Sequence, residues 1–197
     1  MSNAILESPR GPVVVPLDDK LLDERNLFLT SEVNTDSMTS LIKQVKYLTG
    51  DSREDKDKEI TLYINSPGGD VTSGLALYDC LVASQAPIKT VCIGIAASMA
   101  AILFLASDNR TMLPHTRLMI HDPAFLNTSG FSGKKPHELQ QEVDNLNRVK
   151  ETLAEIIAEK TGKTLEEICE VTANDTYFSA QEALEFGLAT EISTKGV

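Results

Sequence analysis

The sequence predicts an α/β fold with a largely parallel sheet and one long helix that protrudes from it. Two observations favour this class. Short β-rich segments alternate with segments of helical periodicity, which is the pattern of strand–helix–strand units. Near the C-terminus, apolar residues recur at intervals of three and four over residues 136–161. The sequence has no internal repeat and no linker, so we expect a single domain over residues 1–197.

The first half of the chain is expected to begin irregularly and to continue with alternating strands and helices. Residues 1–16 contain three prolines and only one short apolar run, so we expect a flexible N-terminal segment. Asp36 is expected to cap the first long helix. The expected elements are a strand at 25–30, a helix at 36–49, a strand at 60–64, a helix at 71–83, a strand at 88–95 and a helix at 98–107.

The second half contains the longest helix, which is expected to begin at Pro136 and to continue to about Thr161. At about 1.5 Å per residue such a helix spans roughly 37 Å, which is more than a compact domain of this size needs. We therefore expect it to project and to pair with another subunit; the alternative is that it lies along its own sheet. The remaining expected elements are strands at 112–113 and 118–120 and helices at 165–171 and 180–186.

Composition and charge exclude several classes of partner. With 29 acidic and 18 basic residues, the chain has a formal net charge of −11, which repels phosphate backbones, so nucleic acid is not an expected partner. No run reaches the roughly eighteen apolar residues of a membrane span, and the N-terminus lacks the pattern of a secretory signal. The three cysteines lie far apart and are expected to be reduced, so we expect a cytoplasmic protein.

Neither a metal nor another cofactor is expected. The histidines and cysteines do not have the spacing of zinc ligands. Neither a Walker A sequence nor a G-x-G-x-x-G follows an expected strand, so neither ATP nor a dinucleotide is expected to bind.

Ser98 lies where an expected strand is followed by an expected helix, within the segment GIAASMA at 94–100. Free amides and the helix dipole at such a position stabilise negative charge, and the small residues before the serine let a substrate chain approach. The position is related to the nucleophile elbow, although G-x-S-x-G is absent. Taken alone, it favours an N-cap over a nucleophile, because serine is a preferred cap.

Two further segments could contribute to the same site. SPGG at 66–69 follows a strand and precedes a helix, so its glycines could direct backbone amides at an oxyanion; a simple tight turn is the alternative. His121 follows the apolar run at 118–120, which places its imidazole at a strand end on the edge where Ser98 is expected. That position suits a general base, although an isolated histidine is more often structural.

Together these segments resemble the ClpP family of serine peptidases. The order and spacing agree with the family from about residue 17 to residue 192, which is nearly the whole chain. The motifs are LYINSPGG at 62–69, ASM at 97–99, MIHDP at 119–123 and FSAQEA at 178–183. The resemblance implies a ClpP/crotonase-like fold of repeated ββα units. It also implies Ser98 as nucleophile, His121 as base, and the amides of Gly68 and Met99 as the oxyanion hole.

The resemblance also implies an assembly and a reaction. Family members form two stacked heptameric rings around an aqueous chamber, and the helix at 136–161 would lie between the rings. An ATP-driven unfoldase of the AAA+ class would deliver unfolded protein substrates, and Tyr63 matches an aromatic residue of the pocket that receives it. Inside the chamber, peptide bonds would be hydrolysed through an acyl-enzyme.

The chain departs from the family at a position of chemical importance. Val171 stands where the family has the aspartate of its triad, and valine can neither accept the imidazole N–H nor stabilise imidazolium. Three outcomes stay open: a substitute acid from Glu170, Asn174 or Asp175; a Ser–His dyad; or a weakly active or inactive structural subunit in a mixed ring with an active paralogue. We favour retained activity, because both chemical residues and the glycine turn are present.

An enzyme of a different class has a similar fold. Crotonase-type acyl-CoA enzymes share the glycine-amide oxyanion hole that the turn at 66–69 resembles. That assignment leaves the segments around Ser98 and His121 unexplained, so the peptidase is the preferred prediction.

Overall fold

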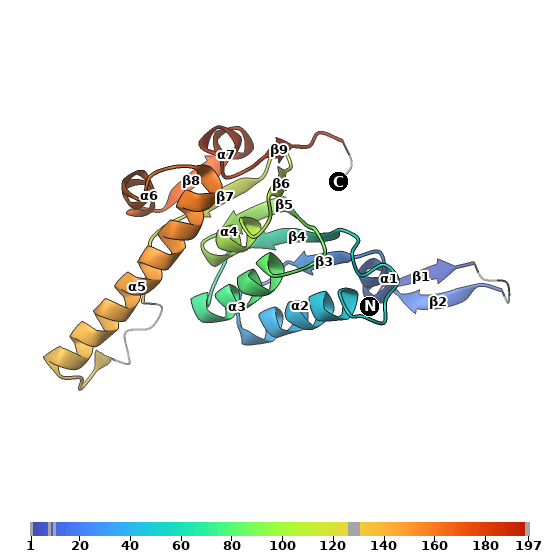
Figure 1. Ribbon diagram of the computed structural model, residues 1–197, viewed down its shortest axis with the longest axis horizontal. Coiled ribbons are helices and arrows are strands. Elements are labelled where there is room, and N and C mark those ends of the chain that lie inside the picture. The colour runs from blue at the N-terminus through green and yellow to red at the C-terminus, as the bar shows by residue number, and fades with distance from the viewer. Residues whose placement is uncertain (1, 8, 10, 126–130, 196–197) are drawn as a thin grey trace.

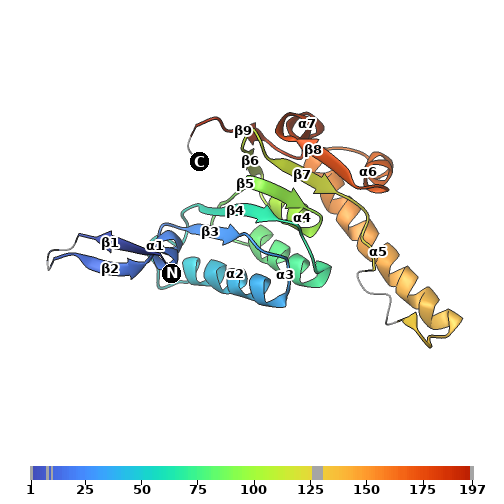
Figure 2. The ribbon, with the colours of Figure 1, turned by 180° about the vertical axis from the view of Figure 1, so that it is seen from behind.

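The computed structural model of the chain describes residues 2–7, 9, 11–125 and 131–195. A largely parallel sheet forms the centre and helices pack against it, while a hairpin and a long helix extend from opposite ends (Figure 1). The view from behind shows the same separation of hairpin and helix tip (Figure 2). The architecture confirms the predicted α/β class.

The sheet is forked, and the fork determines where the site lies. The first half of β5 pairs with β6, over residues 89–92, and its second half pairs with β7, over residues 95–97. The two halves of β5 therefore have different neighbouring strands. β8 then pairs antiparallel with β7, whereas β3-β4-β5-β6-β9 are parallel neighbours. Within the described residues, the seven strands of this sheet are β3 (Asn26–Leu29), β4 (Ile60–Ser66), β5 (Ile88–Ala97), β6 (Asn109–Met112), β7 (Arg117–Ile120), β8 (Thr176–Ser179) and β9 (Glu191–Ile192).

The helices cover the sheet, and α2 and α3 lie side by side below β3 and β4 in Figure 1. α4 follows β5 directly and is the most deeply placed, because each of its six residues is buried. The helices are α1 (Leu17–Asp23), α2 (Thr35–Leu48), α3 (Val71–Val82), α4 (Met99–Phe104), α5 (Pro136–Thr161), α6 (Leu165–Thr172) and α7 (Ala180–Phe186).

α5 has the bounds that its periodicity predicted. Its buried residues, Leu153, Ala154 and Ile157, all lie in its C-terminal half, which packs against the body of the protein. The N-terminal half extends away from the sheet, and Val143 there is 42% exposed (Figures 1 and 2). The structure therefore favours the projecting helix over one that lies along its own sheet.

The start of the chain differs from the irregular segment that the prolines suggested. β1 (Asn3–Leu6) and β2 (Val13–Pro16) form an antiparallel hairpin, in which Ile5 and Val14 are 70% and 63% exposed. Pro16 closes β2 at its end, where a proline is compatible with a strand because no ladder bond is required of it.

The cap of α2 also differs from the prediction. Asn34, and not Asp36, is the N-cap. The Ser37 amide donates a hydrogen bond to the Asn34 side chain, and the Asn34 amide donates one to the Ser37 hydroxyl, both at 3.0 Å. This reciprocal pair starts the helix at Thr35. The sequence reading also missed α1, β8 and β9, which are short elements without a clear period.

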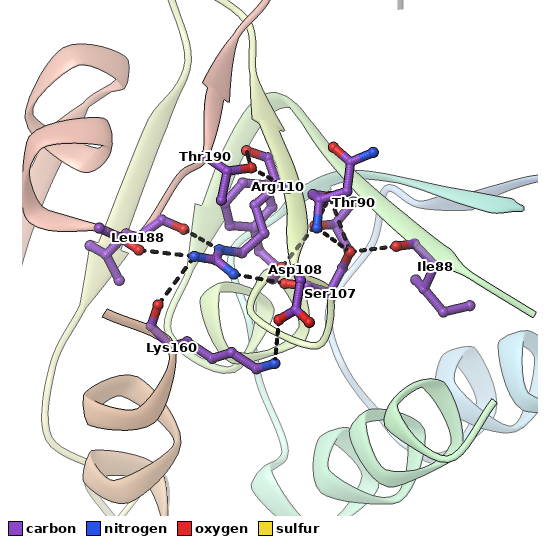
Figure 3. A network of polar contacts seen from close by, with 11 residues as sticks. Ile88, Thr90, Ser107, Asp108, Arg110, Lys160, Leu188 and Thr190 are labelled. Carbon is purple, nitrogen blue, oxygen red and sulfur yellow. Dashed lines mark hydrogen bonds and ion pairs between the residues drawn. The ribbon is translucent and has the colours of Figure 1, made fainter. Parts of the chain in front are cut away.

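Arg110 joins the ends of three helices beneath the sheet (Figure 3). It is 5% exposed, and its guanidinium donates to four backbone carbonyls at 2.8–3.2 Å. The last carbonyls of a helix have no intrahelical partner, so the guanidinium satisfies one carbonyl in the last turn of α5 and others in the segments that follow α4 and α7. Beside it, Lys160 pairs with Asp108 at 2.8 Å. The accepting carbonyls belong to Ser107, Lys160, Gly187 and Leu188.

We expect Arg110→Met to lower the free energy of unfolding by about 3 kcal/mol, because it leaves several buried carbonyls without donors. Urea unfolding followed by circular dichroism measures this. Arg117→Met is the matched control, since Arg117 is exposed on β7, and its effect should stay within about 0.5 kcal/mol. Equal stability of the two variants would show that the carbonyls do not depend on Arg110.

Candidate active site

Ser98 occupies the junction between β5 and α4 in an uncommon backbone conformation. Its φ is 53° and its ψ −124°, a region that costs a non-glycine residue about 1–3 kcal/mol. Its amide donates to the Met119 carbonyl at 2.9 Å, which extends the β5–β7 ladder by one bond. Ser98 occupies the N-cap position of α4, as its place in the sequence suggested, but its hydroxyl makes no capping hydrogen bond to the helix. The strained turn instead leaves the hydroxyl available for another partner.

That partner is His121, which follows β7. The His121 Nε2 lies 2.8 Å from the Ser98 Oγ. The pairing of β5 with β7 opposes Ala97 to Met119, so the residues that follow these two strands emerge next to each other. The structure thus brings together the serine and the histidine that the sequence selected. His115 and His137 lie elsewhere, exposed in the turn before β7 and in the first turn of α5.

Asp175 completes a chain of three side chains. Its Oδ1 lies 3.0 Å from the His121 Nδ1, on the side of the ring opposite Ser98. Asp175 immediately precedes β8, and the antiparallel register pairs Thr176 with Ile120, which places the carboxylate beside the imidazole. Among the three candidates that the sequence left open to replace the triad aspartate, the geometry therefore selects Asp175.

The other positions considered do not reach the imidazole in the described part of the chain. Val171 is partly buried and packs against the hydrophobic core, where a carboxylate would be poorly solvated. Glu170 is exposed on α6. Asn174 is exposed as well, and its carbonyl accepts a long bond of 3.3 Å from the Thr176 hydroxyl.

The glycine turn approaches Ser98 closely. Gly68 has φ +91°, and a Cβ added there would lie 2.5 Å from the Ala97 carbonyl oxygen and 2.9 Å from the Met99 nitrogen. Only glycine permits this approach, because both the dihedral and the space exclude a side chain. The Gly68 carbonyl accepts from the Val33 amide at 2.8 Å, which fixes the turn to the segment before α2.

The two amides predicted for the oxyanion hole differ in their present bonding. The Met99 amide belongs to the first turn of α4, where no intrahelical carbonyl is available. The Gly68 amide donates to the Ser66 hydroxyl at a long 3.2 Å. Ser66 is fully buried and donates in turn to the Ser31 carbonyl at 2.6 Å. Sequence reasoning missed this serine, whose only signal is its place at the start of the SPGG turn.

Two hollows adjoin the Ser98–His121 pair. A cleft of about 530 Å³ has the glycine turn at 67–69 on one side and residues 123–125 on the other. A smaller pocket beside Ser98 and His121 is mainly apolar, with side chains from α3, α4 and α5. Its apolar lining residues are Val71, Met99, Ile102, Ile120, Leu153, Ala154 and Ile157. Three polar residues close to this pocket, Asp122, Lys150 and Thr172, were not singled out by the sequence reading.

The described residues offer neither a metal site nor a membrane-spanning helix. Across the described residues, no three His, Cys, Asp or Glu side chains are grouped so that they could hold a metal ion. None of the described helices combines the length and the apolar character needed to cross a membrane. Cys80, Cys92 and Cys169 are free thiols, and burial raises the pKa of Cys92.

Comparison with known proteins identifies the family. A family model described as Clp protease matches residues 10–196, almost the entire chain. The chain belongs to the Clp protease family. It is 42% identical over 182 residues to the ATP-dependent Clp protease proteolytic subunit 2 of Prochlorococcus marinus (strain NATL2A), which covers 91% of this chain and 88% of that protein. It is 43% identical over 171 residues to the proteolytic subunit 3 of Synechococcus sp. (strain CC9902), which covers 86% and 82%.

Membership of the Clp protease family confirms the predicted resemblance and the predicted class of enzyme, a serine endopeptidase subunit. The crotonase-type assignment is thereby set aside. The motifs around Ser98, His121 and the glycine turn, which carried the resemblance, are also the segments that the fold brings to one place.

We expect Gly68→Ala to lower the hydrolysis of a short fluorogenic peptide by about 100-fold or more, because the new methyl group displaces the turn or the Ser98 backbone. Gly162→Ala is the matched control: Gly162 also has a positive φ, +71°, but an added Cβ would meet nothing within 4 Å. Circular dichroism checks that both variants fold. A Gly68→Ala protein as active as the control would contradict the close approach of the turn.

Proposed function

We propose that this Clp protease family chain hydrolyses peptide bonds of unfolded proteins with Ser98 as nucleophile, His121 as general base and Asp175 as the acid that orients the histidine. The observation that carries the proposal is the pair of hydrogen bonds on opposite sides of the imidazole, 2.8 Å to Ser98 Oγ and 3.0 Å to Asp175 Oδ1. This is the relation of serine, histidine and aspartate in serine hydrolases. Asp175 thus supplies the triad carboxylate that the sequence alone predicted at position 171, where the chain has a valine.

The geometry supports a definite sequence of proton transfers. An ionised Asp175 accepts only, so the imidazole donates through Nδ1–H and keeps a lone pair on Nε2. Nε2 takes the Ser98 proton while Oγ attacks the scissile carbonyl carbon. The tetrahedral intermediate collapses to an acyl-enzyme when His121 protonates the leaving amine. Water, deprotonated by the same nitrogen, then releases the acid and restores Ser98.

The amides of Gly68 and Met99 are proposed to stabilise the oxyanion of the intermediate. The Met99 amide is adjacent to Ser98 in the chain and lies at the start of α4. The Gly68 amide has to exchange its 3.2 Å bond with Ser66 for the oxyanion. A charged acceptor favours that exchange, since hydrogen bonds to ionised groups are about twice as strong as neutral ones.

Substrate recognition is proposed to use the two hollows beside Ser98. The cleft that is lined by the glycine turn and by residues 123–125 has a volume of about 530 Å³, which offers room for a stretch of extended peptide. The mainly apolar pocket has a volume of only about 30 Å³, so it has to widen to take the side chain that precedes the scissile bond, and its lining suits an apolar residue there. No cofactor takes part in this scheme.

We further propose that the chain works in a chamber of two stacked heptameric rings, formed by this chain alone or with a paralogue, in the cytoplasm. The projecting half of α5 with its exposed Val143 suits a contact between rings. An AAA+ unfoldase is the proposed partner, since both relatives are named as ATP-dependent proteolytic subunits. The partly buried Tyr63 stacks on the 41% exposed Phe28 with 5.0 Å between ring centroids, and this aromatic pair is the proposed docking position.

The alternative of a weakly active or inactive structural subunit rests on the valine at position 171. With Asp175 against the Nδ1 of His121, that reason is lost, and no other observation favours it.

We expect Ser98→Ala to abolish peptide hydrolysis and Asp175→Asn to lower kcat about a thousandfold or more, because the amide favours the wrong imidazole tautomer. Steady-state kinetics with a fluorogenic peptide measures both. Glu170→Gln and Asn174→Ala are the matched controls for the neighbouring polar side chains and should keep wild-type kcat. Activity that survives Ser98→Ala would overturn the proposed nucleophile, and activity lost in Glu170→Gln but kept in Asp175→Asn would overturn the proposed acid.

A further inference from the structure

The hydrogen bond between Asp175 and His121 is too weak by itself to keep the Asp175 carboxylate in position. Its side chain is 64% exposed, and its bond to His121 is a single contact of 3.0 Å. Exposed ion pairs contribute only about 0–1 kcal/mol, since water competes for both partners. The position of Asp175 therefore depends on how the turn between α6 and β8 is fixed to the strand that carries His121.

The β7–β8 pairing fixes the C-terminal side of that turn at Thr176, opposite Ile120. On its N-terminal side two hydrogen bonds fix the turn at Thr172, and both involve Asp122. The Asp122 amide donates to the Thr172 carbonyl at 2.7 Å, and the Asp122 Oδ1 accepts the Thr172 hydroxyl at 2.7 Å. Asp122 directly follows His121, and Thr172 lies three residues before Asp175. The contacts thus close a ring: from His121 through Asp122 and Thr172 to Asp175, and back to His121. Thr172 is 4% exposed, so water does not compete for its bonds.

The remaining oxygen of Asp122 is also used. Lys150 of α5 donates to Asp122 Oδ2 at 2.5 Å, and this hydrogen bond, together with the negative charge, raises the pKa of Lys150. Both side chains are about one-third exposed. Since the lysine compensates the carboxylate, Asp122 acts through its hydrogen bonds rather than as a second negative charge on His121. Within the turn, the Thr176 hydroxyl donates to the Val171 carbonyl at 2.7 Å.

We propose that Asp122 and Thr172 are positioning residues for catalysis. They hold the α6–β8 turn against the end of β7 so that Asp175 stays on the Nδ1 of His121, and Lys150 extends the connection to α5. Asp122 does not act as the acid of the triad, because its two oxygens are bonded to Thr172 and Lys150. The inference rests on the proposed function, in which Asp175 orients His121.

A double-mutant cycle tests the inference. Thr172→Val replaces the hydroxyl by a methyl group of similar size. Its kcat is measured alone and in combination with Asp175→Asn, with an activated ester as substrate so that the slow variants stay measurable. We expect Thr172→Val to lower kcat about tenfold with unchanged KM, a coupling of about 1.4 kcal/mol. In the Asp175→Asn background, the same substitution should have no further effect, because the residue that it positions is no longer functional.

Two further variants separate positioning from folding. Thr152→Val is the matched control, since Thr152 is exposed on α5 and its hydroxyl bonds only the Arg148 carbonyl within the helix. It should keep wild-type kcat. Asp122→Asn retains an acceptor for Thr172 and should keep more of kcat than Asp122→Ala. Thermal melting checks that each variant is folded at the assay temperature.

Each outcome decides between the two proposals. If Asp175→Asn leaves kcat unchanged, the proposed acid fails, and the inference fails with it. If Asp175→Asn lowers kcat while Thr172→Val does nothing, or lowers kcat by the same factor in both backgrounds, the proposed acid stands and the positioning role is overturned. An equal factor in both backgrounds is what a purely structural role of Thr172 would produce.

Discussion

The hydrogen bond from the Ser98 amide to the Met119 carbonyl is the constraint on which the site depends. It is the last bond of the short parallel ladder between β5 and β7, and it sets how far the two strands run before they separate. Beyond it, Ser98 turns into α4 with a positive φ, while His121 follows β7 by one residue. A shift of this ladder by one residue would reverse the direction of these side chains and separate hydroxyl from imidazole.

Around this ladder, the structure uses buried arginines where the sheet and the helix ends meet. Arg110 supplies donors to carbonyls at the ends of α4, α5 and α7 (Figure 3), and Arg25 does the same for the Leu48 carbonyl at the end of α2. Burying each guanidinium costs desolvation free energy, and this cost is offset because the same side chain donates hydrogen bonds to several backbone carbonyls. Because one of these carbonyls belongs to Lys160, Arg110 fixes the C-terminal end of α5 to the body of the protein, while the N-terminal half of the helix extends away from the sheet (Figure 1).

Much of the fold and part of the site follow from the sequence. β5 and α5 have long, regular patterns. Ser98 and His121 each follow a predicted strand, but that position alone favours a structural role, and only the resemblance to the ClpP family selects them as catalytic residues. The acid could not be chosen, because the choice depends on the antiparallel register of β8, a four-residue strand without alternation. Val171 in the expected place indicated a missing acid, whereas the register brings Asp175 to the imidazole. Asn34 and Asp36 are both plausible caps in sequence, and only the reciprocal bonds with Ser37 distinguish them.

The most direct measurement is covalent labelling of the purified native chain with a fluorophosphonate, followed by peptide mapping and by the rate of adduct formation. The account predicts a single adduct on Ser98, which forms far more slowly in Asp175→Asn and not at all in the unfolded chain, because the serine reacts only when His121 is oriented. A native chain that remains unlabelled, or one labelled at Ser98 at the same rate with and without the Asp175 carboxylate, would contradict it.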